Sequence, residues 1–123
     1  MMLRLGKVEG KGRGVFATKR IPTGAVIERA PVIVLPPSEW HDVGNTSLYN
    51  YCFRWGDDDD HAALALGFGS LYNHSYSPNA EYLRDEDNDV IEFVALEPIA
   101  KDEEITVNYN GTGDNKPVWF EVK

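Results

Sequence analysis

Turn residues divide this chain into short apolar runs, and none of the runs keeps the spacing of an amphipathic helix. Residues 26–35 are rich in β-branched side chains and predict one strand, or two strands broken near Pro31. Residues 80–83 and 90–95 flank a polar five-residue connection, a pattern typical of a β-hairpin. Residues 104–109 alternate as a further strand. The sequence therefore predicts a mostly β fold.

Other segments carry weaker local signals. Residues 3–8 predict an edge strand, and the aromatic-rich residues 49–55 predict another strand. Residues 36–41 predict a short helical turn capped by Ser38. Glycine occupies every second position of residues 10–14, which would weaken a strand and favours a loop whose backbone meets a ligand.

Length and composition limit the class of protein. A chain of 123 residues predicts a single domain, residues 1–123. No apolar run approaches the roughly 20 residues of a membrane helix, and residues 1–10 lack a signal-peptide core. We therefore expect a cytoplasmic protein, or a nuclear one in a eukaryotic or viral setting, with no membrane partner. The single cysteine, Cys52, lies in an apolar run and is expected to be buried and unreactive.

Charge is unevenly distributed along the chain. The net charge is −8, with +5 in the first twenty residues and −13 in the rest. An acidic body argues against direct nucleic-acid binding and would attract a basic, lysine-rich protein segment. The same acidity would equally serve solubility alone. The dense acidic run, residues 57–60, lacks the spaced oxygen ligands of a calcium loop, so we expect a solvated loop and no metal site.

Residues 67–82 form the most polar and most punctuated stretch of the chain. The glycines permit close backbone approach, and Pro78 favours a turn. Asn73, His74 and Ser75 supply hydrogen-bond donors and acceptors. Alone, the stretch would read as an ordinary polar turn. Two other segments favour the second interpretation, a site for a small polar ligand.

Three segments in fixed order resemble the SET-domain family of protein-lysine methyltransferases. They are Gly-Lys-Gly-Arg-Gly-Val-Phe-Ala at 10–17, the stretch at 67–79 with its Asn-His-Ser-x-x-Pro-Asn motif, and Asp-Glu-Glu-Ile-Thr-Val-Asn-Tyr at 102–109. The resemblance covers residues 5–109 approximately and is similar to the minimal viral and bacterial members that lack flanking zinc modules. It implies a β-clip-like fold of several small, short-stranded sheets. The C-terminal segment of that fold threads beneath a preceding loop as a pseudoknot.

The resemblance also implies methyl transfer from S-adenosylmethionine to a lysine ε-amine in a basic protein, such as a histone or another DNA-binding protein. Asn73 would bind the methionine end of the cofactor, and His74 would bind its adenine. The backbone of a third group would contact the same cofactor: Lys11, Gly12, Arg13 and Gly14.

For the substrate, the resemblance implies Tyr109 as the catalytic tyrosine and a lysine channel of Tyr51, Tyr82 and Tyr109. Without the resemblance, each tyrosine would read as a core or cross-strand aromatic. A desolvated aromatic channel holds an ammonium by cation–π attraction of ~0.5–2 kcal/mol and favours the neutral amine, so no dedicated base is needed. Three residues would pair with the substrate peptide as an added strand: Leu66, Gly67 and Phe68.

The sequence departs from the family pattern in three places. Asn108 stands where the family usually has aspartate, which leaves a second hypothesis, a non-catalytic module that binds a basic peptide. Tyr76 stands where many relatives have cysteine. The cysteines that follow the domain in many relatives are absent. Residues 110–123, with Trp119 and Phe120, would therefore close the site, or else pack on the core or across a homodimer interface.

Overall fold

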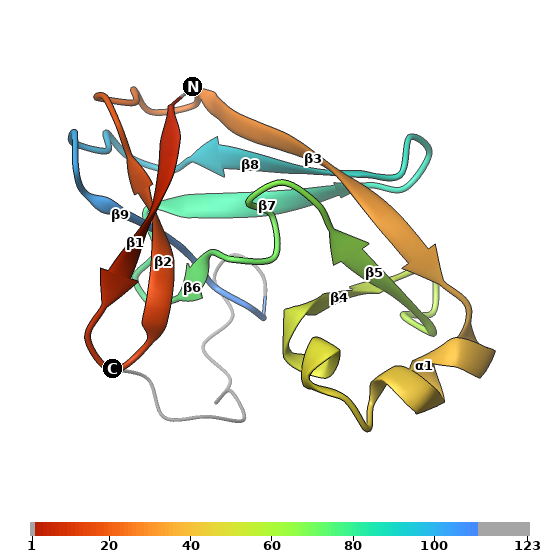
Figure 1. The fold of residues 1–123 in the computed structure, drawn as a ribbon. Coiled ribbons are helices and arrows are strands. Elements are labelled where there is room, and N and C mark those ends of the chain that lie inside the picture. Colours follow the sequence, from red (N-terminus) through yellow and green to blue (C-terminus); the bar gives the residue numbers. More distant parts are fainter. Residues whose placement is uncertain (1, 111–123) are drawn as a thin grey trace.

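The computed structural model describes residues 2–110, and its strands form two sheets (Figure 1). The first sheet has the order β1-β2-β9-β6, with β1 at Leu3–Val8, β2 at Gly12–Ala17, β9 at Glu104–Val107 and β6 at Asn73–His74. It joins the N-terminal hairpin to two segments from the second half of the chain. The predicted strand at residues 3–8 is confirmed.

The second sheet is antiparallel and has the order β4-β5-β3-β8-β7. Its strands are β4 (Cys52–Trp55), β5 (His61–Ala65), β3 (Val26–Leu35), β8 (Val90–Ala95) and β7 (Ala80–Asp85). The predicted β7–β8 hairpin is confirmed. β3 is one continuous strand that changes partner after Pro31, from β8 to β5. The mostly β prediction is thereby confirmed.

Two local predictions need correction. A short helix, α1, covers Pro37–Val43, but Pro36 is its N-cap and Ser38 lies inside the helix without capping it. A proline just before or inside the first turn is favourable because the first helical N–H groups have no partner within the helix. The expected strand at residues 49–55 begins only at Cys52, since Ser47–Tyr51 forms a 3₁₀ helix, η1.

The loop expected at residues 10–14 is also wrong beyond Lys11, because β2 pairs with β1 along its whole length. The turn of this hairpin occupies only residues 9–11. Gly10 inside the turn and Gly12 directly after it have positive φ angles of 79° and 83°. Gly14 serves a different purpose. A Cβ at Gly14 would collide with the Glu104 carboxylate and would lie 2.8 Å from Asn73 Nδ2. Glycine is needed at this strand position for close approach rather than for flexibility.

The core is shared by both sheets and their connections. Val15, Ile21, Phe93, Ile99 and Ile105 are all fully buried in one apolar cluster. Burying each such side chain contributes roughly 1.5–3 kcal/mol to folding.

A short parallel pairing between β6 and β9 brings distant segments together (Figure 1). Asn79 supports this crossing: its Nδ2 donates to the Glu104 carbonyl at 2.8 Å, and its Oδ1 accepts from the Thr106 N–H at 2.9 Å. The buried Asn79 amide thus replaces a missing strand neighbour for β9. The crossing places the residues that follow β9 beside β6, and the Tyr109 N–H donates to His74 Nδ1.

Candidate active site

A cleft of about 560 Å³ opens where the N-terminal hairpin, η1 and the β6 segment meet. Its volume lies within the range usual for small-molecule sites, roughly 300–1,000 Å³. Five of the six residues predicted to bind the cofactor line it: Lys11, Gly12, Arg13, Asn73 and His74. Gly14 does not line it, because its open face is occupied by Glu104 and Asn73. Tyr51 and Tyr109 also border the cleft.

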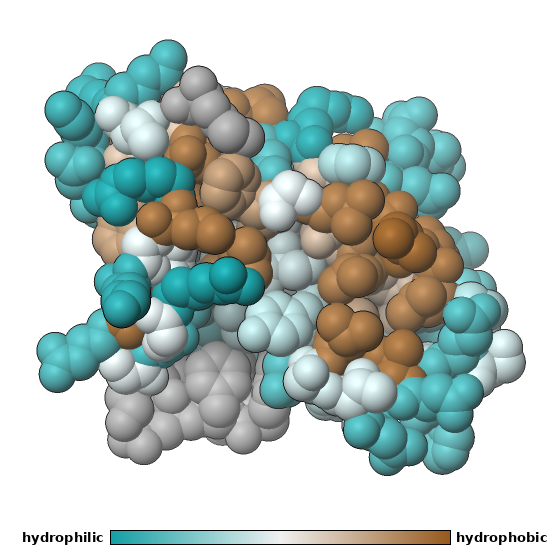
Figure 2. Space-filling view, in the orientation of Figure 1, coloured by the Kyte–Doolittle hydropathy of each residue, from teal (hydrophilic) through white to brown (hydrophobic). Residues whose placement is uncertain are grey.

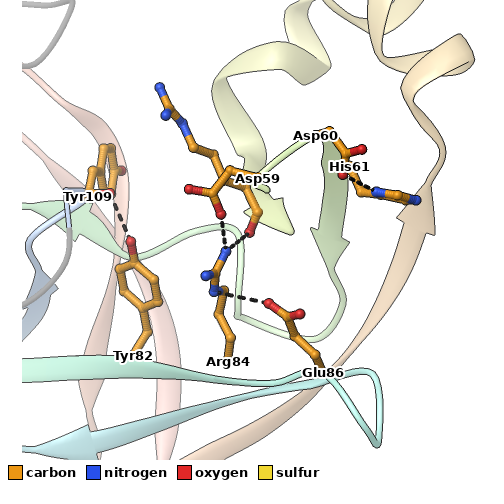
Figure 3. A network of polar contacts seen from close by, with 8 residues as sticks. Asp59, Asp60, His61, Tyr82, Arg84, Glu86 and Tyr109 are labelled. Carbon is orange, nitrogen blue, oxygen red and sulfur yellow. Dashed lines mark hydrogen bonds and ion pairs between the residues drawn. The ribbon is translucent and has the colours of Figure 1, made fainter. Parts of the chain in front are cut away.

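Tyr109 makes hydrogen bonds through its hydroxyl, its N–H and its carbonyl. Its hydroxyl donates to the Tyr72 carbonyl at 2.7 Å, and its N–H donates to His74 Nδ1 at 3.0 Å. Its carbonyl accepts from the Tyr82 hydroxyl at 2.9 Å, as Figure 3 shows. Burial raises the pKa of Tyr109 to about 12, with smaller contributions from Tyr51 and the Glu104 charge. The phenol is therefore neutral at physiological pH.

Tyr72, whose carbonyl accepts from the Tyr109 hydroxyl, is itself held by Glu28 from the second sheet. The Tyr72 side chain is buried, and its hydroxyl donates to Glu28 Oε1 at 2.8 Å. Glu28 Oε2 accepts the Phe68 N–H at 2.9 Å. Burial raises the pKa of Tyr72, and the Glu28 charge and hydrogen bond raise it further. The Glu28 carboxylate on β3 thus holds two residues of the segment that precedes β6, Phe68 and Tyr72.

A β-bulge places this carboxylate. In the β3–β8 pairing, Val26 lies opposite Val94 and Glu28 lies opposite Phe93, so Ile27 is the extra residue. Directly paired residues share a face, and Phe93 is fully buried, so Glu28 faces inward. Glu28 lies outside the three sequence motifs. An acid within the apolar run 26–35 is the sequence signal that could have found it.

His74 is buried, and its ring packs edge-on against Tyr76 and lies 5.2 Å from the Tyr109 ring. Burial lowers the pKa of His74, and the Lys11 charge lowers it further. Since Nδ1 accepts the Tyr109 N–H, the neutral ring carries its proton on Nε2. The His74 carbonyl accepts from the Lys11 ammonium at 3.4 Å, which connects β6 to the hairpin turn.

Asn73 is fixed by two acceptors. Its Nδ2 donates to the Arg13 carbonyl at 3.1 Å and to Glu104 Oε2 at 2.7 Å. These bonds link β6 to β9, its neighbour in the first sheet, and to β2, the strand beyond β9.

The three predicted channel tyrosines are not equivalent. Tyr51, at the end of η1, is 42% exposed and borders the cleft together with Tyr109. Tyr82 is not among the residues that line the cleft, and its ring packs edge-on against Phe53 at 5.1 Å between centroids. Its hydroxyl instead supports the backbone of Tyr109.

The segment expected to pair with a peptide strand is not extended. Leu66, Gly67 and Phe68 form a turn, in which Gly67 has a φ of 62°. The Leu66 N–H donates to the Pro31 carbonyl and the Phe68 N–H donates to Glu28, so neither donor is available to a ladder. The pairing of this segment with a substrate peptide stays a prediction.

Leu66 and Gly67 do line a second hollow, of about 390 Å³. It shares Arg13, Tyr51 and two further residues with the cleft, so the two are neighbours. Its other walls include Leu48 and Leu64. Figure 2 shows apolar side chains gathered over β4 and β5 on this side of the molecule.

The acidic run at residues 57–60 makes an ion pair through Asp59 and a side-chain contact with a histidine through Asp60 (Figure 3). Asp59 accepts from the Arg84 guanidinium at 2.8 Å, and Asp60 lies 2.6 Å from His61 Nδ1. The hydrogen bond that Arg84 donates to Asp59 raises the pKa of Arg84. The run therefore connects the β4–β5 loop to β7. Within residues 2–110 no group of three or more acidic, histidine or cysteine side chains is arranged to hold a metal ion.

Asn108, the departure from the family pattern, is buried, and its Oδ1 accepts the Asn110 N–H at 3.0 Å. An amide oxygen does this as an aspartate oxygen would, so the substitution preserves the turn after Tyr109. Trp119 and Phe120 lie outside the described residues. Across residues 2–110 no helix is long and apolar enough to span a membrane.

Comparison with known proteins agrees with this geometry. Residues 12–110 match the family described as SET domain. A Schizosaccharomyces pombe protein named histone-lysine N-methyltransferase, H3 lysine-37 specific, is 36% identical over 120 residues, which are 97% of this chain and 77% of that protein.

A crystal structure of a candidate histone methyltransferase from Plasmodium falciparum superposes with a TM-score of 0.69 at 30% identity. The match covers 88% of this chain and 92% of that one, and it confirms the predicted fold class. The chain belongs to the SET-domain family of protein-lysine methyltransferases.

Proposed function

We propose that the cleft binds S-adenosylmethionine and that Tyr109 lies where the methyl group passes to a substrate lysine. The observation that supports this most directly is the meeting of three distant segments. The hairpin turn at residues 9–11, the β6 residues and Tyr109 border one cleft of suitable volume.

The residues present fit such a cofactor. A Cβ at Gly12 would meet nothing within 4 Å, so the hairpin wall of the cleft is open to a ligand. Lys11 offers a cation for a carboxylate, and the Asn73 amide offers a polar group for the amino-acid end. His74 is neutral and does not repel a positive ligand. When bound, S-adenosylmethionine supplies a methyl group activated by the sulfonium charge.

Tyr109 would orient the substrate amine. Its hydroxyl donates its one hydrogen to the Tyr72 carbonyl, so toward a substrate amine the phenol oxygen can act only as an acceptor. Because the pKa of Tyr109 is raised to about 12, this oxygen carries no negative charge that would stabilise the protonated amine. Tyr51 borders the same cleft and would add an aromatic wall that excludes water. Tyr82 would act through the backbone of Tyr109.

The substrate proposed is a lysine in a basic protein segment such as a histone tail. The fission-yeast relative is named for lysine 37 of histone H3, and the acidic balance of this chain complements a basic peptide. The second hollow, beside Leu66 and Gly67, is the proposed place for the peptide next to the target lysine. Since Asn108 has a structural role that an amide fulfils, it no longer favours a non-catalytic module.

Calorimetric titration with S-adenosylmethionine tests the proposal. Wild type is expected to bind, and Asn73→Ala is expected to bind at least about tenfold more weakly, because it loses a hydrogen-bonding group at the ligand. Asn88→Ala, in the β7–β8 connection, is the matched control and should bind as wild type does. Absence of binding by wild type, with and without a lysine-rich peptide, would contradict the proposed site.

A further inference from the structure

The amide of Asn73 has only one orientation compatible with its surroundings. One terminal atom lies 3.1 Å from the Arg13 carbonyl and 2.7 Å from Glu104 Oε2. A carbonyl and a carboxylate only accept hydrogen bonds, so the atom between them is the NH₂ group. Both of its hydrogens are used, and the amide oxygen is the polar atom that Asn73 retains for the cleft.

Glu104 is brought to Asn73 by the strand register. Glu104 lies on β9 opposite Phe16 of β2. Asn73 of β6 pairs with Thr106, which is also on β9. Gly14 leaves the space in which the two side chains meet, since a Cβ there would collide with the Glu104 carboxylate. The contact therefore depends on three strands of the first sheet, β2, β6 and β9.

We propose that Glu104 is a positioning residue for the methyl donor, because it holds the Asn73 amide with its oxygen available to the ligand. The inference rests on the proposed function of the cleft. An oxygen acceptor at this point selects a ligand group that donates, such as the ammonium of an amino-acid end. If the amide were reversed, it would present an NH₂ group and disfavour that ammonium.

A second physical role for Glu104 would be direct attraction of a cationic ligand by its charge. Two conservative variants separate the roles. Glu104→Gln keeps the reach and an acceptor oxygen but loses the charge. Glu104→Asp keeps the charge but withdraws the carboxylate by one methylene, which breaks the 2.7 Å contact.

The experiment is calorimetric titration of both variants with S-adenosylmethionine and with S-adenosylhomocysteine, which has the same amino-acid end without the sulfonium charge. Positioning predicts that Glu104→Asp weakens both ligands about tenfold and that Glu104→Gln stays within about threefold of wild type. In an Asn73→Ala background, Glu104→Asp should have no further effect, because its partner is absent. Glu97→Ala, an exposed acid in the turn after β8, controls for the lost charge.

Three results would overturn the inference: weakening by Gln as large as by Asp, full additivity with Asn73→Ala, or wild-type affinity in Glu104→Asp. If Asn73→Ala weakens binding while the Glu104 variants do not, the proposed function stands and only this inference fails. If wild type does not bind, both fail. Thermal unfolding of each variant distinguishes a local loss of affinity from a loss of the fold, and Glu104→Gln, which is nearly isosteric, keeps the test valid if Glu104→Asp does not fold.

Discussion

Tyr109 shows how neighbouring groups can orient one side chain, because its hydroxyl, its N–H and its carbonyl all make hydrogen bonds within the fold. Tyr109→Phe removes the hydroxyl and keeps the ring. We expect kcat to fall about 10²-fold, since small misplacements of a reacting group have effects of that size. Cofactor affinity should change less than about threefold. Methyl transfer to a lysine-rich histone peptide, measured by mass spectrometry, and calorimetry check both expectations.

Tyr49→Phe is the matched control, because Tyr49 is exposed and stacks on Trp40 outside the cleft. It should methylate as wild type does. A Tyr109→Phe enzyme that is as fast as wild type would remove Tyr109 from the proposed chemistry.

At the scale of residues, the sequence predicts the side chains that border the cleft better than the side chains that hold them in place. Asn73, His74 and Tyr109 stand in motifs and do lie at one cleft. Glu28 stands outside the three motifs, and Tyr72 and Glu104 stand inside two of them without a predicted role, because a motif does not say which side chains meet in the fold. Glu28 is 44 residues from Tyr72, and Glu104 is 31 residues from Asn73. Such pairs are set by strand register.

At the scale of elements, β3 positions the turn before β6 through its bulge and the inward-facing Glu28. Glu28→Gln leaves one acceptor oxygen for two donors, the Tyr72 hydroxyl and the Phe68 N–H. We expect a loss of about 1–3 kcal/mol in the free energy of unfolding, because one buried donor is left without an acceptor. kcat should also fall, since the Tyr72 carbonyl that accepts from Tyr109 lies on this turn. Urea unfolding and steady-state kinetics measure the two effects.

Glu92→Gln on β8 is the comparison, because its exposed pair with Arg29 at 2.6 Å should contribute at most about 1 kcal/mol. If the two variants lose equal stability and equal kcat, the positioning role of the β3 bulge is wrong.

The elements themselves were predictable where hydrophobic alternation and turn residues agree. β1 and the β7–β8 hairpin meet that condition. β2 does not, because its glycines look like loop residues although Gly14 is required by a tertiary approach. The two-residue strand β6 has no periodicity of its own and is a strand because it pairs with β9, whose backbone Asn79 also holds.

For the whole molecule, the neutral state of His74 connects folding to pH. The ring packs against Tyr76 and Tyr109, and Lys11 is the charged group that faces it. Burial and Lys11 lower the pKa of His74 below the unfolded value of about 6.5. Between the two pKa values the unfolded chain binds more protons, so stability present above pH 6.5 is lost as the pH falls through the folded pKa.

His74→Asn tests this dependence, because an asparagine Oδ1 can accept the Tyr109 N–H in place of Nδ1 and does not titrate. Urea unfolding at pH 8, 7, 6 and 5 should show a smaller decline in stability for His74→Asn than for wild type. His41→Asn, on the exposed face of α1, should keep the wild-type decline. Parallel declines in wild type and His74→Asn would show that acid sensitivity arises elsewhere. A smaller decline in His74→Asn would mean that protonation of His74 lowers the stability of the whole fold. The same ring accepts the Tyr109 N–H, so this protonation would also disturb the wall of the cleft.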